Sequence, residues 1–476
     1  MKRLEVMEQN DAEAIHVNSL YLLEHMGIKV VSDEGRRLLK EAGADVDEKT
    51  KICRIPSYLV DESIRRCKRP VKIAGRNPEY DFVLDGDHCF ACTDGVGLST
   101  IDLESGERRG STLKDVADSA KIVDHLPMIH MYNPIVTPLD VPKHSHTVHE
   151  FMAALENCEK HFTTGSTYQK EEAQYEIKMA AEVVGGYKEL RRRPIISNLT
   201  CTTSPMVLGM TTDAAIEFSR AGCPPLLMAM PLIGATAPMT VAGAVLLGNA
   251  QVIALATVLQ LAAPGSPLCY SSEPMAMDVQ SGLFEGLFPA ANMVRAAHVQ
   301  MAKHYDIPIF IGGWGSCSKA PDVQAGYEKA FSAFIAYLSG ADITSGPGLL
   351  ENWTVLSFEQ LIIDHEMFTM MADMLKGFPV DDDSMPLDVI MDVGHEGHYM
   401  GKKHTLDHFR SMWQPMVTDG QTYRTWKDAG GKNAVDHARE KAKEILKTHL
   451  PEPLDADISK KLKALVAEAD INIPHK

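Results

Sequence analysis

Positively charged residues are scarce in this chain. Its 476 residues include 47 Lys and Arg against 64 Asp and Glu, which gives a formal net charge of −17. Nucleic-acid binding needs clustered Lys and Arg to neutralise phosphates, and binding to an anionic membrane surface needs similar basic clusters. The charge balance therefore argues against both kinds of partner.

The sequence also lacks an apolar leader and an uninterrupted apolar run. Met1-Lys2-Arg3-Leu4-Glu5 opens a polar stretch of helical character, unlike the apolar core of a signal peptide. The most apolar run, residues 241–263, is interrupted by Gly, Asn and Gln, which favours a buried barrel helix over a membrane span. Nine scattered cysteines predict free thiols in a reducing cytoplasm, not a disulfide framework.

The glycine-rich phosphate loops of nucleotide-binding open sheets are missing too. Neither G-x-G-x-x-G nor G-x-x-x-x-G-K-[ST] occurs. Instead, strand-like runs alternate with amphipathic segments of helical length at intervals of roughly 30 to 45 residues, the spacing of βα units. Eight such units predict an α/β fold, a closed (β/α)₈ barrel. The strand-like runs start near His130, His161, Pro194, Pro225, Pro267, Pro308, Ala341 and Leu387.

The pattern divides the chain into three regions. Residues 1–125 are expected to form helices and, over 71–110, a small antiparallel sheet with tight turns. Residues 126–400 would form the barrel, and residues 401–476 would form helices that pack on its outside.

A (β/α)₈ barrel carries its functional residues where strands end and loops begin. Trp314 stands among glycines at the end of the sixth predicted strand, Gly312-Gly313-Trp314-Gly315, where a π face attracts cations and Gly313 lets a ligand approach the backbone. Glu273 and Glu351 follow other strands and would add negative charge to a cation pocket. His395 and His398 follow the eighth predicted strand and are candidate ligand-binding groups.

Metal sites are the main alternative for these residues. His395-Glu396-Gly397-His398 has two imidazoles, but no third ligand is evident and Gly397 disfavours a helix. Cys89-x-x-Cys92 has no second pair nearby. We therefore expect no metal site in this chain.

Several of these blocks resemble one known family. The run Gly312-Gly313-Trp314-Gly315 with 318–328 (SKAPDVQAGYE), Ser345-Gly346-Pro347-Gly348 and 394–399 (GHEGHY) is similar to the trimethylamine methyltransferase superfamily. The Asp94-Gly95 turn fits as well, and the resemblance spans nearly the whole chain. Archaeal trimethylamine enzymes of this family use pyrrolysine. This chain has only standard residues, so it resembles the non-pyrrolysine branch, which demethylates quaternary amines.

The resemblance implies a methyltransferase that moves a methyl group from a quaternary amine to the Co(I) corrinoid of a cognate partner protein. Glycine betaine, giving dimethylglycine, is the first candidate; proline betaine, carnitine and butyrobetaine are alternatives. The nucleophile would be the partner's cobalt, so no catalytic residue is assigned and no cofactor is expected to be bound covalently. An alternative is a quaternary-ammonium binding protein without activity, and a homo-oligomer is plausible.

On this interpretation the substrate's two ends need different contacts. An aromatic box of Trp314, Tyr270, Tyr327 and Tyr399 would hold the ammonium head. His395, His398 or Lys319 would hold a carboxylate tail.

Overall fold

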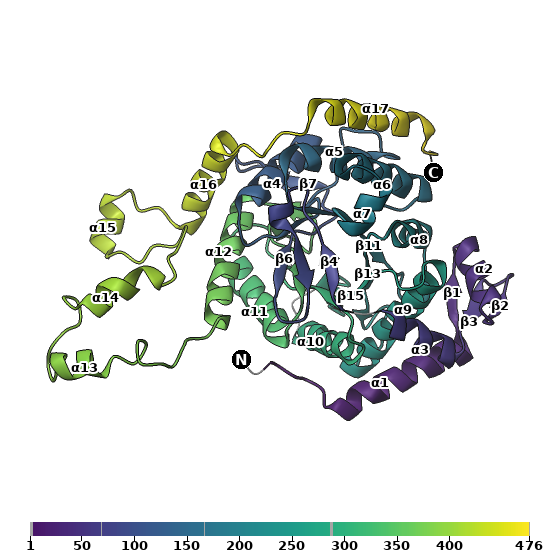
Figure 1. Ribbon diagram of the computed structural model, residues 1–476, viewed down its shortest axis with the longest axis horizontal. Helices are drawn as coiled ribbons and strands as arrows, with labels where there is room; N and C mark the ends of the chain where they lie inside the picture. The colour runs from purple at the N-terminus through teal and green to yellow at the C-terminus, as the bar shows by residue number, and fades with distance from the viewer. Residues whose placement is uncertain (1–2, 68, 166, 286–288, 476) are drawn as a thin grey trace.

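Eight parallel strands close into a barrel at the centre of the molecule (Figure 1). The computed structural model describes residues 3–67, 69–165, 167–285 and 289–475. Around the barrel the strands run in the order β9, β10, β11, β13, β15, β18, β19 and β6, and β6 pairs with β9 to close the ring. They are β6 (Phe90–Cys92), β9 (Met131–Tyr132), β10 (His161–Thr164), β11 (Ile196–Cys201), β13 (Pro225–Ala229), β15 (Cys269–Ser272), β18 (Ile309–Gly312) and β19 (Ile343–Ser345).

Seven of the eight barrel strands lie where the sequence pattern predicts them, and the eighth does not. The run at Leu387 is a helix, α13 (Leu387–Val393), with no buried residue, so the prediction of a strand there is wrong. Its apolar residues Leu387, Ile390 and Met391 follow helical spacing after Pro386. The missing strand is β6, which pairs in parallel with β19 and β9 and comes from the 71–110 segment.

A ring of helices surrounds the barrel, because each strand is followed by a helix that packs back on the sheet (Figure 1). The ring is α4 (Leu113–His125), α5 (His146–Asn157), α6 (Lys170–Val184), α8 (Thr211–Ala221), α9 (Val241–Ala262), α10 (Pro289–His304), α11 (Val323–Ser339) and α12 (Phe358–Leu375). Short α7 (Tyr187–Arg192) follows α6. Helix α9 is long and apolar enough to cross a membrane, but 72% of its most apolar window is buried against the barrel, as predicted for a barrel helix.

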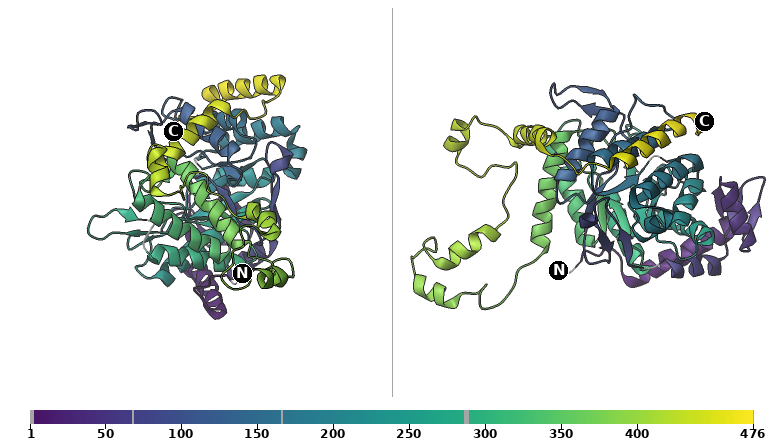
Figure 2. Two further views of the ribbon diagram at one scale, coloured as in Figure 1. Left: turned by 90° about the vertical axis from the view of Figure 1, so that its left-hand side faces the viewer. Right: turned by 45° about the horizontal axis from the view of Figure 1, so that its top comes forward.

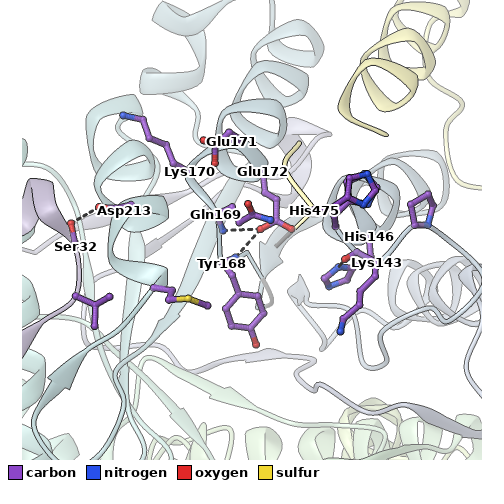
Figure 3. A pocket seen from close by; sticks show the side chains of 14 residues that line it. Ser32, Lys143, His146, Tyr168, Gln169, Lys170, Glu171, Glu172, Asp213 and His475 are labelled. Atoms are coloured by element: carbon purple, nitrogen blue, oxygen red, sulfur yellow. Dashed lines mark hydrogen bonds between the residues drawn. The ribbon is translucent and has the colours of Figure 1, made fainter. Parts of the chain in front are cut away.

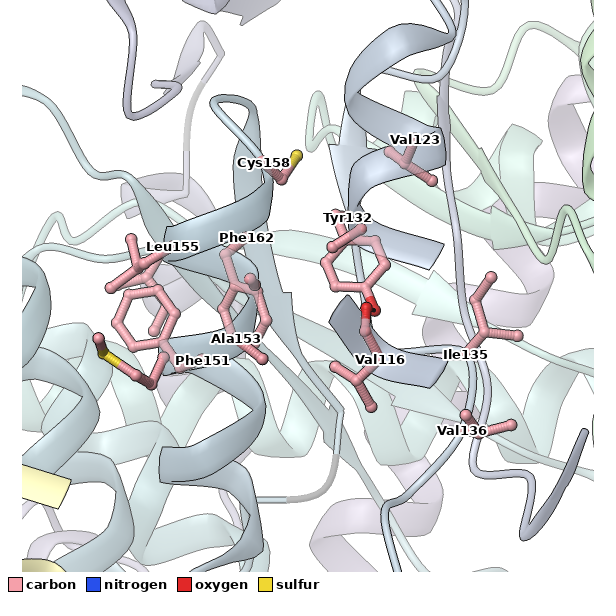
Figure 4. Packing of buried hydrophobic residues seen from close by; sticks show 14 of the residues in the cluster. Val116, Val123, Tyr132, Ile135, Val136, Phe151, Ala153, Leu155, Cys158 and Phe162 are labelled. Carbon is pink, nitrogen blue, oxygen red and sulfur yellow. Dashed lines mark hydrogen bonds between the residues drawn. The ribbon is translucent and has the colours of Figure 1, made fainter. Parts of the chain in front are cut away.

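Aromatic side chains fill the layer between strands and helices on one side of the barrel (Figure 4). The rings of Phe151 on α5 and Phe162 on β10 have centroids 4.6 Å apart, and Tyr132 on β9 packs 6.3 Å from Phe162. All three are buried. Tyr132 and Phe162 point outward from β9 and β10, so the neighbouring positions of these two strands face into the barrel.

The N-terminal segment packs beside and beneath the barrel. Helix α1 (Gln9–Tyr21), a π-helical turn (Leu22–Met26), α2 (Asp33–Glu41) and α3 (Ser57–Arg66) surround a sheet of β1 (Ile28–Val30), β2 (Asp45–Asp47), β3 (Ile52–Arg54) and β12 (Val207–Leu208). The hairpin of β4 (Val71–Ile73) and β5 (Phe82–Leu84), joined by a 3-10 turn (Pro78–Tyr80), buries Val71, Ile73 and Leu84 against the lower barrel interior.

The 71–110 segment does not form the single antiparallel sheet that the sequence predicts. Only β4–β5 stays a separate hairpin, while β6 joins the barrel. Strands β7 (Ser99–Ile101) and β8 (Arg108–Gly110) form another sheet with β20 (Leu349–Leu350) and β21 (Val355–Leu356). A further small sheet contains β14 (Leu232–Ile233), β16 (Met275–Met277) and β17 (Phe284–Glu285).

A long segment between α12 and α16 projects away from the barrel, and we call residues 377–433 the arm (Figure 2). It contains α13, α14 (Lys403–His408), a 3-10 turn (Phe409–Ser411) and α15 (Tyr423–Asp428). Beyond it, α16 (Ala434–Thr448) packs on α12 and α4, and α17 (Ala456–Asn472) packs on α6 and α5.

Candidate functional site

The barrel interior changes from apolar to polar toward the carboxyl ends of its strands. Cys92, Met131, Cys269, Phe310 and Ile343 belong to one buried cluster inside the barrel. Because side chains alternate along a strand, residues two or four positions later face the same way. These positions form a polar layer: Asp94 after β6, Asn133 after β9, Glu273 after β15 and Ser345 at the end of β19. We call these four residues the barrel mouth.

Glu273 enters this layer as a buried anion. Its Oε1 accepts a hydrogen bond from Arg295 of α10, and both side chains are almost fully buried. Burial raises the pKa of Glu273, and the Arg295 guanidinium opposes that shift. Its other oxygen, Oε2, accepts no hydrogen bond from any residue in the described ranges. The carboxylate thus has one buried oxygen without a hydrogen bond among the described residues, and leaving such an oxygen unsatisfied is costly.

Gly312 on β18 makes room for this carboxylate. A Cβ built on Gly312 would lie 1.1 Å from Glu273 Oε2, closer than any two non-bonded heavy atoms can approach. Only glycine fits here, and β18 therefore contributes no side chain to this layer. Glu273 Oε2 occupies this space, and the charge of Glu273 contributes to raising the pKa of Asp94.

Asp94 is the second acidic group of the mouth. Its Oδ2 accepts a hydrogen bond of 3.0 Å from Ser345 Oγ, and its Oδ1 accepts one of 2.8 Å from the Gly95 amide and one of 3.4 Å from Asn133 Nδ2. Burial first, and the charge of Glu273 second, raise the pKa of Asp94 to about 7. The two carboxyl groups therefore interact electrostatically inside the barrel.

These groups give the mouth an electrostatic character that would favour a cation. Among the described residues of this layer, Asp94 and Glu273 are buried carboxyl groups, and the buried guanidinium of Arg295 pairs with Glu273. A positively charged ligand between Asp94 and Glu273 would remove the repulsion that raises the pKa of Asp94. A buried charge gains most from such pairing because the surroundings are poorly polarisable.

A cavity of about 750 Å³ is lined by the loops after β9 and β10, by Ser32 after β1 and by Asp213 of α8 (Figure 3), and its lining does not include the four mouth residues. Tyr168, in the loop after β10, lines it and is about half exposed. Burial and the neighbouring thiol of Cys201 raise the pKa of Tyr168, and burial and Asp94 raise that of Cys201 to about 12. Cys201, at the end of β11, therefore interacts electrostatically with both Asp94 and Tyr168, and Lys143 and Lys170 line the cavity together with Tyr168.

Two of the predicted aromatic contacts lie behind the barrel wall instead. The ring of Trp314 is fully buried, packs 5.9 Å from Phe368 of α12 and donates a hydrogen bond of 3.2 Å from Nε1 to Thr344 Oγ1. Tyr270 is also fully buried, and its OH donates to Asn249 Oδ1 of α9 at 3.2 Å. Both rings fill the layer between strands and helices, so in this structure neither offers a face to a ligand.

Other predicted residues are scattered over the surface. Tyr327 is 62% exposed on α11. His395, His398 and Tyr399 lie on the arm and are exposed, because the predicted eighth strand that would have placed them at the mouth is α13.

The last three predicted residues lie near strand ends but have structural contacts. Lys319 donates a hydrogen bond of 2.7 Å to the carbonyl of Cys317, and Glu351 pairs with Arg108 of β8. Gly313 packs its backbone against α11, where a Cβ would lie 3.3 Å from Ala333.

Sequence reasoning missed Asp94 as a site residue because Asp94 follows β6, the barrel strand that was not predicted. It also missed Asn133, although Asn133 follows β9, whose position was predicted. Glu273 was recognised as a possible source of negative charge because it follows a strand that was predicted correctly. Tyr168 follows β10, and its place two residues before the helix α6 could have marked it as a rim residue.

The mouth does not resemble a metal-ligand cluster. Within the described ranges, no group of three or more His, Cys, Asp or Glu is arranged to hold a metal ion. His161, inside the barrel, has both ring nitrogens within 2.9 Å of Ala74 O and Ser197 Oγ. Cys89 and Cys92 are free thiols, and burial raises the pKa of both.

Comparisons with known proteins agree with this geometry. The structure of the hydroxylamine complex of MtmB has the same fold, with a TM-score of 0.51 and 13% identity over 94% of this chain and 96% of that one. The trimethylamine methyltransferase MttB of Desulfitobacterium hafniense DCB-2 is 33% identical over 96% of this chain and 92% of its own. The trimethylamine methyltransferase MttB of Methanosarcina barkeri Fusaro is 31% identical, over 98% and 95%.

A relative named for a quaternary amine is also found. The glycine betaine methyltransferase of Desulfitobacterium hafniense Y51 is 28% identical over 98% of both chains. The trimethylamine methyltransferase (MTTB) family model matches residues 1–474. With the barrel and its acidic mouth, this match shows that the chain belongs to the trimethylamine methyltransferase family.

Proposed function

We propose that this enzyme transfers a methyl group from a quaternary amine to the reduced corrinoid of a separate partner protein. The observation that carries the proposal is the pair of buried carboxyl groups, Asp94 and Glu273, with an unpaired oxygen on Glu273. Such a pair favours a cation in a poorly hydrated site. A quaternary ammonium keeps its charge at every pH, so it suits a mouth whose own charge changes near pH 7.

The chemistry asks little of the protein beyond binding and orientation. A corrinoid presented by the partner would supply the nucleophile for the methyl carbon, and the electrons of the broken C–N bond would leave with a neutral tertiary amine. No proton has to reach that nitrogen, so the mouth needs no acid or base for this step. Glu273 and Asp94 hold the ammonium head, and the barrel wall excludes water, which amounts to catalysis by positioning and desolvation.

The residues of the mouth fit a corrinoid that another protein presents. They offer carboxyl, amide and hydroxyl groups, while the imidazole of His161 is engaged in two hydrogen bonds. The mouth lies at the open carboxyl end of the strands, since the β4–β5 hairpin closes the opposite end. A partner's cofactor would therefore approach from the side of the 750 Å³ cavity.

Glycine betaine is the specific substrate that we propose, with proline betaine, carnitine and butyrobetaine as alternatives. The mouth repels a carboxylate, so a betaine would turn its tail outward, away from Glu273. Tyr168, Lys143 and Lys170 line the rim cavity on that side and carry hydrogen-bond donors. A longer betaine would reach further along this rim, so tail length is the property to vary.

The test combines the protein, a cob(I)alamin or cognate corrinoid protein, and a panel of these betaines plus trimethylamine. Methylation of cobalt is followed by absorbance, and binding is measured separately by calorimetry. We expect methyl transfer from at least one quaternary amine, with Glu273→Gln at least 10-fold weaker in binding and Glu351→Gln as the matched control. Binding of betaines without any methyl transfer would favour a binding protein and overturn the proposal.

A further inference from the structure

The arm exposes far more apolar surface than the rest of the molecule. Thirteen of the 36 exposed large hydrophobic side chains that the structure describes lie between residues 378 and 423. Phe378, Met391 and Met400 are each at least 80% exposed. Within the described residues, no side chain from 378 to 416 is buried. A monomeric protein rarely leaves a contiguous surface of this kind in water.

The arm has regular structure that its own chain does not support. Helices α13 and α14 have seven and six residues, far below the length at which an isolated helix is stable in water. Neither has a buried residue. Their fold therefore requires contacts from outside the chain.

The arm leaves α12 and returns to it. Trp413 Nε1 donates a hydrogen bond of 3.0 Å to Thr369 Oγ1, and the amide of Val417 donates one of 2.6 Å to Glu366. Residues 378–412 form the free part, which lies between the end of α12 and the first of these attachments, Trp413. Figure 2 shows this part as an open hook beside α12.

A second apolar surface lies on the barrel next to the hook. On α11, Val323, Tyr327 and Phe331 follow one another at four-residue spacing and are 85%, 62% and 54% exposed. Helix α11 packs against α12, where Met370 and Met374 are about half exposed. We call these five residues the α11–α12 face. In the views of Figure 2 the arm leads away from this side of its own barrel.

We propose that the arm clasps the α11–α12 face of a second copy of this chain, in a two-fold dimer that exchanges arms. One chain carries both an apolar hook and an apolar face, and a two-fold axis brings each hook to the other copy's face. The free part spans 35 residues, somewhat more than the roughly 20–30 residues per side of a standard stable interface. A second copy is a permanent cover, whereas a partner that docks and leaves would return this apolar surface to water.

In this dimer, the His395-Glu396-Gly397-His398 motif of the arm would lie against the other copy. His395, His398 and Tyr399 lie between α13 and α14, so they travel with the hook to the neighbouring copy. Their environment in the dimer is an interface between copies. This inference concerns assembly and does not depend on which amine the barrel mouth binds.

Sedimentation velocity over a range of concentrations tests the dimer. We expect the full chain to sediment at twice its 52.3 kDa. The double variant Met391→Glu/Leu406→Glu places two charges on the hook and should weaken association at least 100-fold, because an unpaired charge is costly to bury. Leu450→Glu/Ile471→Glu, at 82% and 81% exposed positions off the arm, is the matched control and should sediment like the wild type.

Photocrosslinking tests the partner surface. A benzoylphenylalanine at position 327, in a mixture of ¹⁴N- and ¹⁵N-labelled chains, should crosslink to residues 378–412 of the other isotope. A monomeric wild type would overturn the proposal, as would a dimer that the arm variant leaves unchanged. Crosslinks confined to a single chain or to another surface would also overturn it.

Discussion

The carboxylate of Glu273 occupies the space beside Gly312 that any side chain there would need. Gly312→Ala would place a Cβ 1.1 Å from Glu273 Oε2, so the carboxylate would have to leave its place beside Arg295. We expect a stability loss of roughly 1–3 kcal/mol, as for other overpacked interiors, and at least 10-fold weaker binding of a quaternary amine. Urea unfolding and calorimetry measure the two effects.

Gly326 on α11 provides the matched control for this substitution. A Cβ there meets nothing within 4 Å, and Gly326→Ala should stabilise the helix by about 0.5–1 kcal/mol without altering binding. Equal effects at the two glycines would contradict the account of Gly312.

Asp94 makes stability depend on pH near neutrality. Its folded pKa is about 7 because burial and Glu273 disfavour the charged form, whereas an unfolded Asp titrates near 3.9. The folded chain thus holds this proton more tightly, and the stability it contributes is lost as the pH rises through 7. Asp94→Asn should abolish a loss of about 2–3 kcal/mol between pH 5 and 8, measured by urea unfolding.

The exposed Asp392 is the control for this pH effect. Lys402 lowers the pKa of Asp392, so its titration lies below this range and Asp392→Asn should keep the wild-type slope. Parallel pH profiles for Asp94→Asn and the wild type would show that Asp94 does not titrate near neutrality.

At the scale of single residues, Glu273 could be predicted as a source of negative charge at a strand end, because it follows a strand whose apolar run is clear in the sequence. The binding of a cation there stays a prediction. Trp314 could not be placed, because the chain bends after Gly312 and turns the ring toward Phe368. A bend of this kind depends on tertiary packing, which periodicity does not record.

Among the elements, β6 and α13 show why seven barrel strands were predictable and the eighth was not. Strand β6 has only three residues and lies between the β4–β5 and β7–β8 hairpins, so the local sequence favours an antiparallel neighbour. Its actual partners, β9 and β19, are parallel to it and come later in the chain. Helix α13 is apolar on one side and was mistaken for a strand. Because no residue of α13 is buried in this chain, its few apolar residues do not show the full stripe of a helix that packs on a core.

Helix α12 holds the arm and α16 through two different carboxylates. Glu366 accepts hydrogen bonds from the amides of Val417 and Thr418, and Glu359 pairs with Arg439 of α16. Glu366→Gln should speed hydrogen exchange of residues 413–420 by at least 10-fold, because an amide oxygen is a weaker acceptor than a carboxylate.

Glu359→Gln on the same helix should instead loosen α16 and leave the arm unchanged. Mass spectrometry after timed exchange separates the two segments. Faster exchange of both segments in both variants would mean that arm and α16 open as a single unit.

For the whole molecule, the barrel cannot be cut at residue 125. A fragment of residues 126–476 retains seven barrel strands and leaves the edges of β9 and β19 unpaired. We expect it to show no cooperative urea transition and little near-ultraviolet circular dichroism, in contrast to the full chain. A cooperative transition in the fragment would mean that β6 is dispensable for closure.

The late closure of the barrel also sets an order of events on the ribosome. Cys92 on β6 pairs with Ser345 on β19, which is 253 positions later in the chain. At about 5–20 residues per second, roughly 13–50 seconds separate the synthesis of the two strands. Asp94 therefore waits, unpaired with Ser345, until most of the chain has been made. The barrel mouth is therefore among the last parts of this protein to form, and under the proposed function a nascent chain that stalls before β19 could not bind the amine.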